Sequence, residues 1–229
     1  GYFSLDTRNA FVGVSNGDVE FADIDNDNDS DVLITGYSTS RTTKLYSNDG
    51  TGLFTEITGT TLDNLQYSAV GFEDIDGDND LDLLITGLNT SNQRIAKLYT
   101  NDGSGNYNLV DGTPFLGVQQ CDLKFSDIDS DGDPDLVICG SNTSYQPSVN
   151  LYLNDGDGNY TLKSTPAFEG IFVGEIDLAD VDADGDIDII TTGKTAYNPT
   201  TQTTEISALY LNDGSENFSL SEEHDFPRL

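Results

Sequence analysis

The chain has 229 residues and a mass of 24.7 kDa, and its 41 acidic and 9 basic residues give a formal net charge of −32 at pH 7. This length suffices for one large all-β domain with a core of its own. The negative charge repels nucleic acid and anionic membranes, and no apolar run approaches the roughly 18 residues of a membrane span. We therefore expect cations and neutral ligands as partners, with no nucleic acid and no membrane insertion.

An acidic segment of nine residues occurs four times along the chain. It reads DIDNDNDSD at residues 23–31, DIDGDNDLD at 74–82, DIDSDGDPD at 127–135 and DVDADGDID at 180–188. Each copy is followed by an apolar run with a Gly at or near its end, then by a polar stretch and then by LYSNDG, LYTNDG or LYLNDG. The repeated unit is therefore a whole supersecondary structure and not a single loop.

The second unit shows the strands expected in every unit. One strand precedes the acidic loop (SAVGFED) and one follows it (LDLLITG); a third ends at LYTND, and a fourth follows the Asn-Asp-Gly turn (NYNLVDG). Four-stranded antiparallel units that repeat every 40–50 residues or so are typical of β-propeller blades. A β-sandwich gives no reason for one loop to recur four times in one register. We predict an all-β chain, 1–229, that forms a propeller arc of four blades within a larger ring.

The acidic loops have the chemistry of calcium sites. Two carboxylates about 4 Å apart repel by roughly 4 kcal/mol near a protein surface, and a cation between them offsets this repulsion. Side chains at loop positions 1, 3, 5 and 9 and the main-chain carbonyl at position 7 can surround Ca²⁺, which accepts 6–8 oxygen ligands. A solvated acidic surface is the alternative. The expected ligand residues are Asp23, Asp25, Asp27, Asp29 and Asp31; Asp74, Asp76, Asp78, Asp80 and Asp82; Asp127, Asp129, Asp131, Asp133 and Asp135; and Asp180, Asp182, Asp184, Asp186 and Asp188.

The loop also has its own turn residues. Position 6 needs a sharp, left-handed turn, which Gly132 and Gly185 adopt freely and which Asn28 and Asn79 tolerate well. The loop is not an EF-hand, because it has no Glu at position 12 and leads into a strand instead of a helix.

The D-x-D-x-D-x-x-x-D loop followed by an apolar strand resembles the FG-GAP/VCBS repeats of integrin α-chain propellers and of secreted bacterial proteins. The clearest FG trace is GFED from Gly71. The resemblance implies structural calcium sites on one face of a propeller and a secreted or cell-surface protein. Members of the family include adhesion receptors, lectins and polysaccharide lyases. A calcium-stabilised module that binds a glycan or an extracellular protein is thus expected, with a lyase-type enzyme or a purely structural module as alternatives.

The loops between the second and third strands differ from unit to unit. In a meander they lie on the face opposite the acidic loops, and their Thr, Ser, Asn and Tyr residues suit sugar hydroxyls or a protein partner. Ordinary solvated loops are the alternative. The residues expected to contact a ligand are Tyr37, Arg41, Arg94, Tyr145 and Tyr197. Phe11, Leu62, Phe115 and Phe168 recur in the connectors between units, and their repetition predicts packing between blades.

Catalysis has little support in the sequence. The single histidine, His224, lies near the C-terminus, and the acids Glu73, Glu169 and Glu175 have no evident catalytic partner. We do not expect an enzyme. Cys121 and Cys139 flank one loop on strands that should pair directly, where a disulfide is geometrically awkward, so two buried thiols are favoured over a bond.

The ends of the chain predict association. Residues 1–21 align without gaps to 52–72 and 105–125, which places a fourth strand at GYFSL without its own first three strands. The chain would then contain one fourth strand more than four blades need. We expect a homo-oligomer that completes the propeller, for example two arcs that close an eight-bladed ring.

Overall fold

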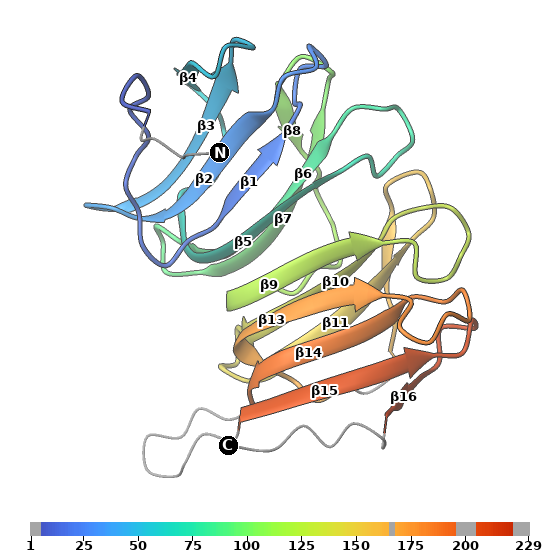
Figure 1. Cartoon of the computed structure of the whole chain (residues 1–229). Helices are drawn as coiled ribbons and strands as arrows, with labels where there is room; N and C mark the ends of the chain where they lie inside the picture. Colours follow the sequence, from blue (N-terminus) through green and yellow to red (C-terminus); the bar gives the residue numbers. More distant parts are fainter. Residues whose placement is uncertain (1–5, 165–167, 196–204, 222–229) are drawn as a thin grey trace.

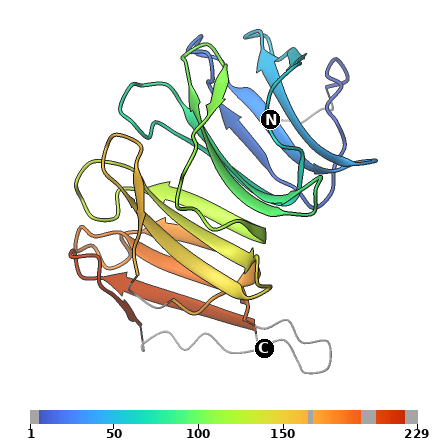
Figure 2. The same cartoon turned by 180° about the vertical axis from the view of Figure 1, so that it is seen from behind.

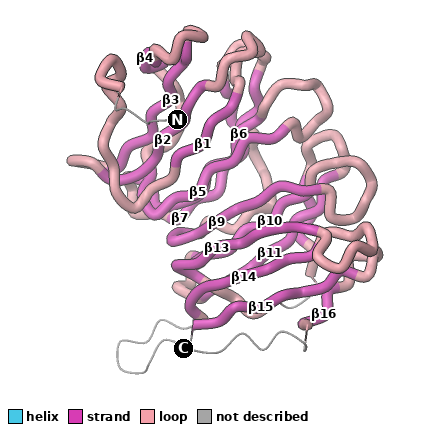
Figure 3. Tube along the Cα trace, in the orientation of Figure 1, coloured by secondary structure: helices cyan, strands magenta, loops and turns pink. Residues whose placement is uncertain are grey.

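The computed structural model describes residues 6–164, 168–195 and 205–221, and this part of the chain contains strands and loops without a helix (Figure 3). Sixteen strands form four antiparallel sheets of four, in which each strand pairs with the next along the chain. We call each sheet a blade. No helix in the described ranges is long and apolar enough to cross a membrane. The predicted all-β architecture of four-stranded blades is confirmed.

The first two blades have the following strands. The first comprises β1 (Val19–Ala22), β2 (Asp31–Tyr37), β3 (Arg41–Asn48) and β4 (Phe54–Ile57). The second comprises β5 (Leu65–Glu73), β6 (Asp82–Asn89), β7 (Arg94–Asn101) and β8 (Tyr107–Leu109).

The last two blades repeat this order. The third comprises β9 (Val118–Ser126), β10 (Asp135–Asn142), β11 (Pro147–Asn154) and β12 (Tyr160–Leu162). The fourth comprises β13 (Phe172–Ala179), β14 (Asp188–Lys194), β15 (Glu205–Asn212) and β16 (Phe218–Leu220). The residues GYFSL at the N-terminus, where a further strand is expected, lie outside the described ranges.

The blades form an open arc. Strand β5 packs beside β9, and β9 beside β13, so the first strands of the blades lie next to one another along the inner side of the arc (Figure 1). The first and fourth blades lie at opposite ends of the row, which is also seen from behind in Figure 2. In the described part of the chain the ring is therefore not closed.

The hydrophobic core lies between successive blades and not inside any one of them. Leu33 and Leu45 on the back of the first blade pack against Val70, Leu83 and Ile85 on the front of the second. Each strand provides core residues to both faces of its blade, because successive side chains point to opposite sides of a sheet. The same arrangement joins the second blade to the third and the third to the fourth. A blade thus completes its core only with a neighbour on each side.

The connector between blades packs on the blade that follows it. The ring of Phe115 meets that of Tyr152 edge to face at 5.1 Å, and the Tyr152 hydroxyl accepts a hydrogen bond of 2.9 Å from the main-chain N–H of Leu116. Phe168 packs in the same way on Tyr210. Leu62, Phe115 and Phe168 take part in the cores between blades, as predicted, whereas Phe11 is exposed and contacts Tyr46 and Phe54 of the first blade. These contacts explain the Tyr of the LYLND sequence.

A bulge in the inner strand explains the Gly near the end of each apolar run. Tyr67 and Gln120 have φ of 52° and 53°, and the pairing of β5 with β6 and of β9 with β10 shifts register beside them. The bulged backbone approaches the next strand closely, so that a Cβ added to Gly140 would lie 2.8 Å from the Cβ of Cys121. No side chain fits at this position.

Candidate functional site

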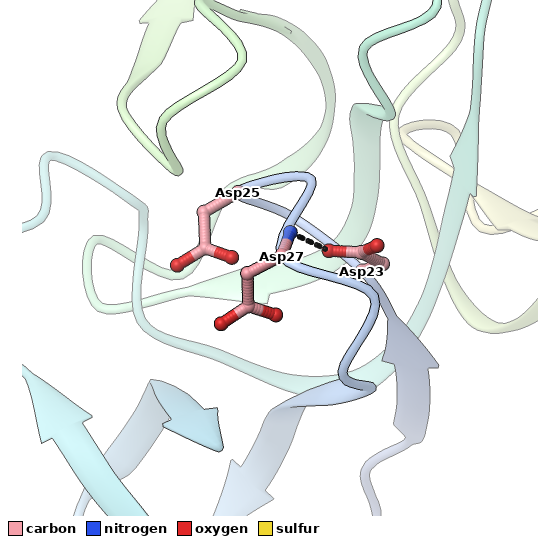
Figure 4. A group of neighbouring side chains, drawn as sticks. All are labelled: Asp23, Asp25 and Asp27. Atoms are coloured by element: carbon pink, nitrogen blue, oxygen red, sulfur yellow. Dashed lines mark hydrogen bonds between the residues drawn. The ribbon is translucent and has the colours of Figure 1, made fainter. Parts of the chain in front are cut away.

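Each acidic loop joins the first and second strands of a blade and gathers three carboxylates. One oxygen from each of Asp23, Asp25 and Asp27 lies within 4.8 Å of the other two, and Figure 4 shows these side chains around one loop. The loops of the other blades repeat the cluster. Its members there are Asp74, Asp76 and Asp78 in the second blade, Asp127, Asp129 and Asp135 in the third, and Asp180, Asp182 and Asp184 in the fourth.

Two left-handed residues wrap each loop around the cluster. Position 6 has positive φ in every copy, as predicted, at Asn28 (68°), Asn79 (69°), Gly132 (99°) and Gly185 (100°). Position 4 is also left-handed, which the sequence analysis missed, at Asn26 (59°), Gly77 (74°), Ser130 (62°) and Ala183 (65°). Asn and Gly in the first two copies were the available signal, whereas Ser and Ala in the last two concealed it.

The loop's own main chain holds the first aspartate in place. The carboxylate of Asp23 accepts hydrogen bonds from the N–H groups of Asp27 and Asn28, at 3.1 and 3.0 Å, and the first of these is drawn in Figure 4. Asp74 accepts the same two bonds from Asp78 and Asn79. These bonds orient the carboxylate before any ligand is present.

The aspartate at position 9 ties the loop to the third strand of its blade. In the third blade, Asp135 is fully buried and accepts hydrogen bonds of 2.9 Å from the main-chain N–H groups of both Ile128 and Asn154. Asp31, Asp82 and Asp188 make the equivalent pairs of bonds. The loop pattern predicts only metal binding for these aspartates, and the tertiary structure reveals this second role. Of the four, only Asp135 belongs to a carboxylate cluster.

The side chain at position 7 reaches the neighbouring Asn-Asp-Gly turn. A Cβ added to Gly50 would lie 2.6 Å from Oδ2 of Asp29, and one added to Gly103 would lie 2.7 Å from Oδ2 of Asp80. The acidic loop and the turn therefore lie at the same end of the blade, as the meander predicts.

The electrostatics of the clusters favour a bound cation. Burial raises the pKa of Asp25 and Asp76, and the neighbouring carboxylates of Asp27 and Asp78 raise it further. Oδ1 of Asp25, of Asp76 and of Asp127 is buried without a hydrogen-bond partner. A buried carboxylate oxygen without a partner is costly, and a metal ion would satisfy it. The residues present therefore fit a hard cation such as Ca²⁺.

The opposite face presents the residues expected to contact a ligand. Tyr37 and Tyr145 are exposed there. The guanidinium carbon of Arg94 lies 4.0 Å from the ring centroid of Tyr145 in the next blade, which is a cation–π contact. Arg41 likewise reaches the next blade, where it donates hydrogen bonds of 2.6 Å to the Asn89 carbonyl and 2.8 Å to Oδ1 of Asn92. Tyr197 lies outside the described residues.

A cavity of about 570 Å³ opens where the inner strands of the blades begin. Its wall includes the residues of the strand bulges, Asn16, Tyr67, Gln120 and Val173, together with Lys194. These bulge residues occupy corresponding positions in the four repeats, a pattern that the sequence analysis did not use. The cavity lies at the same end of the blades as the variable loops.

Comparison with known protein families agrees with this geometry. The family model described as FG-GAP-like repeat matches residues 23–85 and 127–191, which together make up more than half of the chain. Each matched range begins at the first aspartate of an acidic loop and extends through the next one into the following strand. No curated protein matches the chain. The chain therefore belongs to the family of proteins built from FG-GAP-like repeats.

Proposed function

We propose that this chain is a calcium-stabilised extracellular β-propeller module that recognises a glycan or another protein. The observation that carries the calcium assignment is the carboxylate cluster in each of the four acidic loops, where three oxygens lie within 4.8 Å of one another. The buried oxygens of Asp25, Asp76 and Asp127 that have no hydrogen-bond partner support it.

Calcium fits these loops better than magnesium does. Ca²⁺ accepts 6–8 oxygen ligands in flexible geometry, whereas Mg²⁺ requires an octahedron and retains its waters. The loops are short and partly exposed, which favours sites of low affinity. Extracellular sites bind Ca²⁺ with Kd of about 10⁻⁴–10⁻³ M, and such sites would be empty in the cytosol. An extracellular location is therefore part of the proposal.

Thermal unfolding with and without calcium tests the metal assignment. A ligand that binds only the folded state stabilises it by about 2.7 kcal/mol for each site at a hundredfold excess over Kd. For a chain of this size, one such site raises Tm by roughly 5–10 °C. We expect a higher Tm in millimolar CaCl₂ than in EGTA, with poor rescue by MgCl₂. Equal midpoints, together with an absence of bound calcium, would contradict the proposal.

A site variant makes the test specific. Asp25→Asn keeps the size of the side chain and removes its charge, so equilibrium dialysis should find one calcium ion fewer per chain. Asp111→Asn is the matched control, since Asp111 is exposed and lies outside all four loops. A calcium count that falls equally in both variants would show that the metal is held by diffuse charge and not by the loop.

The recognition surface is proposed at the variable-loop face. Exposed Tyr37 and Tyr145 are flat amphipathic platforms, and the cavity at the same end of the blades has polar walls at Asn16 and Gln120. We assign Arg41 and Arg94 to the same surface, where their contacts with the next blade hold the loops in position. We propose binding without catalysis.

A glycan array in calcium tests recognition. The native chain should give a signal that Tyr145→Ala and Tyr37→Ala reduce, and Leu109→Ala, an exposed residue of the outer strand β8, should leave it unchanged. An array without any signal would argue against glycan recognition. Release of ultraviolet-absorbing unsaturated products from a polysaccharide would instead identify a lyase.

A further inference from the structure

The acidic residues are unevenly distributed over the molecule. In each of the first three blades the second and third strands form a hairpin, and residues 32–48, 83–101 and 136–154 of these hairpins contain no Asp or Glu. The acidic loops lie at the opposite end of the blades. The net charge of −32 by itself favours cations and neutral ligands, but the tips of these hairpins carry no carboxylate that would repel an anion.

Two arginines on these hairpins have no acidic partner among the described residues. Four other basic side chains do form ion pairs with acids, namely Arg8, Lys44, Lys97 and Lys163. Arg41 and Arg94 occupy equivalent positions at the start of β3 and β7, and each reaches the variable loop of the next blade. The two arginines differ in what they contact there.

The loops that these two arginines reach differ in a single residue. Residues 89–93 read NTSNQ and residues 142–146 read NTSYQ. In both loops, the side chain of the first Asn accepts hydrogen bonds from the main-chain N–H groups of the third and fifth residues. The residues that differ, Asn92 and Tyr145, have φ of 58° and 60°. The two loops therefore share one backbone conformation and present a different side chain at this position.

This side chain decides whether the arginine already has hydrogen-bond partners. Arg41 donates from both terminal nitrogens, at 2.6 Å to the Asn89 carbonyl and at 2.8 Å to Oδ1 of Asn92. Arg94 instead stacks on the Tyr145 ring and donates no hydrogen bond to any described residue. A guanidinium that stacks on a ring keeps its in-plane N–H groups free, and their fork matches the oxygens of an anion.

Two further observations indicate a ligand at this pair. Nε of Arg94 is buried without a hydrogen-bond partner, so the cation is partly removed from water without a counter-charge, and a bound anion would stabilise it. Tyr145 is 69 % exposed and left-handed, a conformation that suits the Asn of the other loop better than a bulky aromatic residue. Backbone strain of this kind is found mainly at functional sites.

We propose that Arg94 and Tyr145 form a binding site for an acidic glycan. Arg94 donates to a carboxylate or sulfate group of the glycan, and a sugar ring stacks on the face of Tyr145 that Arg94 leaves open. The flat, partly apolar ring favours a glycan over an acidic peptide, because it fits the apolar face of a sugar. This inference rests on the proposed recognition function of the variable-loop face and adds the class of its ligand.

A glycan array with matched probes tests the charge of the ligand. One set of probes consists of oligosaccharides of uronic acids, and a second set contains the same oligosaccharides after reduction of their carboxyl groups to neutral sugars. A third set is sulfated, and acidic peptides form a fourth. In calcium and about 0.15 M salt, which screens charges beyond roughly 8 Å, we expect the carboxylated or the sulfated set to bind at least about tenfold more tightly than the neutral set.

Two variants test the residues of the site. Tyr145→Asn gives the loop the sequence NTSNQ, which the second blade already contains, and offers Arg94 the acceptor that Arg41 has in Asn92. Tyr145→Asn and Arg94→Gln should each weaken binding of the acidic probe at least about tenfold. Lys44→Gln is the control for net charge, because it removes one positive charge at the ion pair with Glu56, and it should leave binding unchanged.

Four results would overturn the proposal. Equal binding of the acidic and neutral probes would leave glycan recognition in place and remove its selectivity for charge. Binding of acidic probes that neither variant weakens would assign that binding to calcium bridges at the acidic loops, whose aspartates both variants retain. Binding of the acidic peptides alone would identify a protein partner. An array without any glycan signal would contradict this inference and glycan recognition together.

Discussion

The side-chain amide of Asn154 in the third blade donates a hydrogen bond of 2.8 Å to the main-chain carbonyl of Ile75 in the second, and both residues are buried. The two residues are 79 positions apart in the sequence. Because the carbonyl belongs to the acidic loop, this bond connects the acidic loop of one blade to the third strand of the next.

Asn154→Ala should destabilise the fold by about 1–3 kcal/mol, since it leaves the buried Ile75 carbonyl without a partner. Urea unfolding in calcium measures this change. Asn159→Ala is the control, because the Asn159 amide is exposed and bonds only Asp155 of its own turn. Its effect should stay within about 0.5 kcal/mol. If the free energy of unfolding falls equally in the two variants, the hydrogen bond between blades contributes no more to stability than the exposed bond within the turn.

Ala183→Gly should stabilise the fourth blade by about 1 kcal/mol, because Ala183 has φ of 65° and a left-handed alanine is strained. Thermal unfolding in calcium is the measurement. Ala179→Gly changes the same residue types in the regular strand β13, and there the added backbone freedom should cost about 0.5–1 kcal/mol. If both variants shift Tm in the same direction, backbone strain at position 4 is not the cause.

The metal-free protein should lose stability as pH rises. Burial raises the pKa of Asp82 and of Asp135 to about 7, well above the 3.8 of an unfolded aspartate. Between these values the folded state holds more protons than the unfolded state, so the free energy of unfolding decreases from about pH 4 to pH 7 and then levels off.

Urea unfolding of the metal-stripped chain at pH 5 and pH 8 measures this slope. Acid also reduces the net charge, so the double variant Asp82→Asn, Asp135→Asn serves as the control and should show a smaller difference. Calcium should reverse the trend at pH 8, because it binds the ionised carboxylates. A metal-stripped chain that is more stable at pH 8 than at pH 5 would contradict this assignment.

The two thiols should react slowly in the folded chain. The structure has both free, as the sequence favoured: Cys139 is buried and Cys121 is half-buried beside the Tyr67 carbonyl. Burial raises the pKa of Cys139 to about 12, and only the thiolate attacks a disulfide reagent. Labelling at pH 8 should therefore be at least about a hundredfold slower before unfolding than after it. Unfolded, unreduced protein that yields no thiol would instead show a disulfide.

The sequence by itself determined the elements and the candidate metal sites. Alternating apolar residues, Asn-Asp-Gly turns and evenly spaced aspartates act over a few residues, so the strands, the hairpins and the left-handed turn at Asn28 and Gly132 could be predicted locally. The repeat then predicted that all four units share one structure.

Only the tertiary structure decided what each side chain touches beyond its own blade. Alternation shows that Leu33 and Val32 point to opposite faces, but it does not identify the surface that covers either of them. The contacts of Asn154 with Ile75 and of Arg94 with Tyr145 join residues that are 51 or more positions apart. A pattern that acts over a few residues cannot predict contacts at this separation. The second role of Asp135 depends on the folded blade, because its partner Asn154 lies 19 positions away on the third strand.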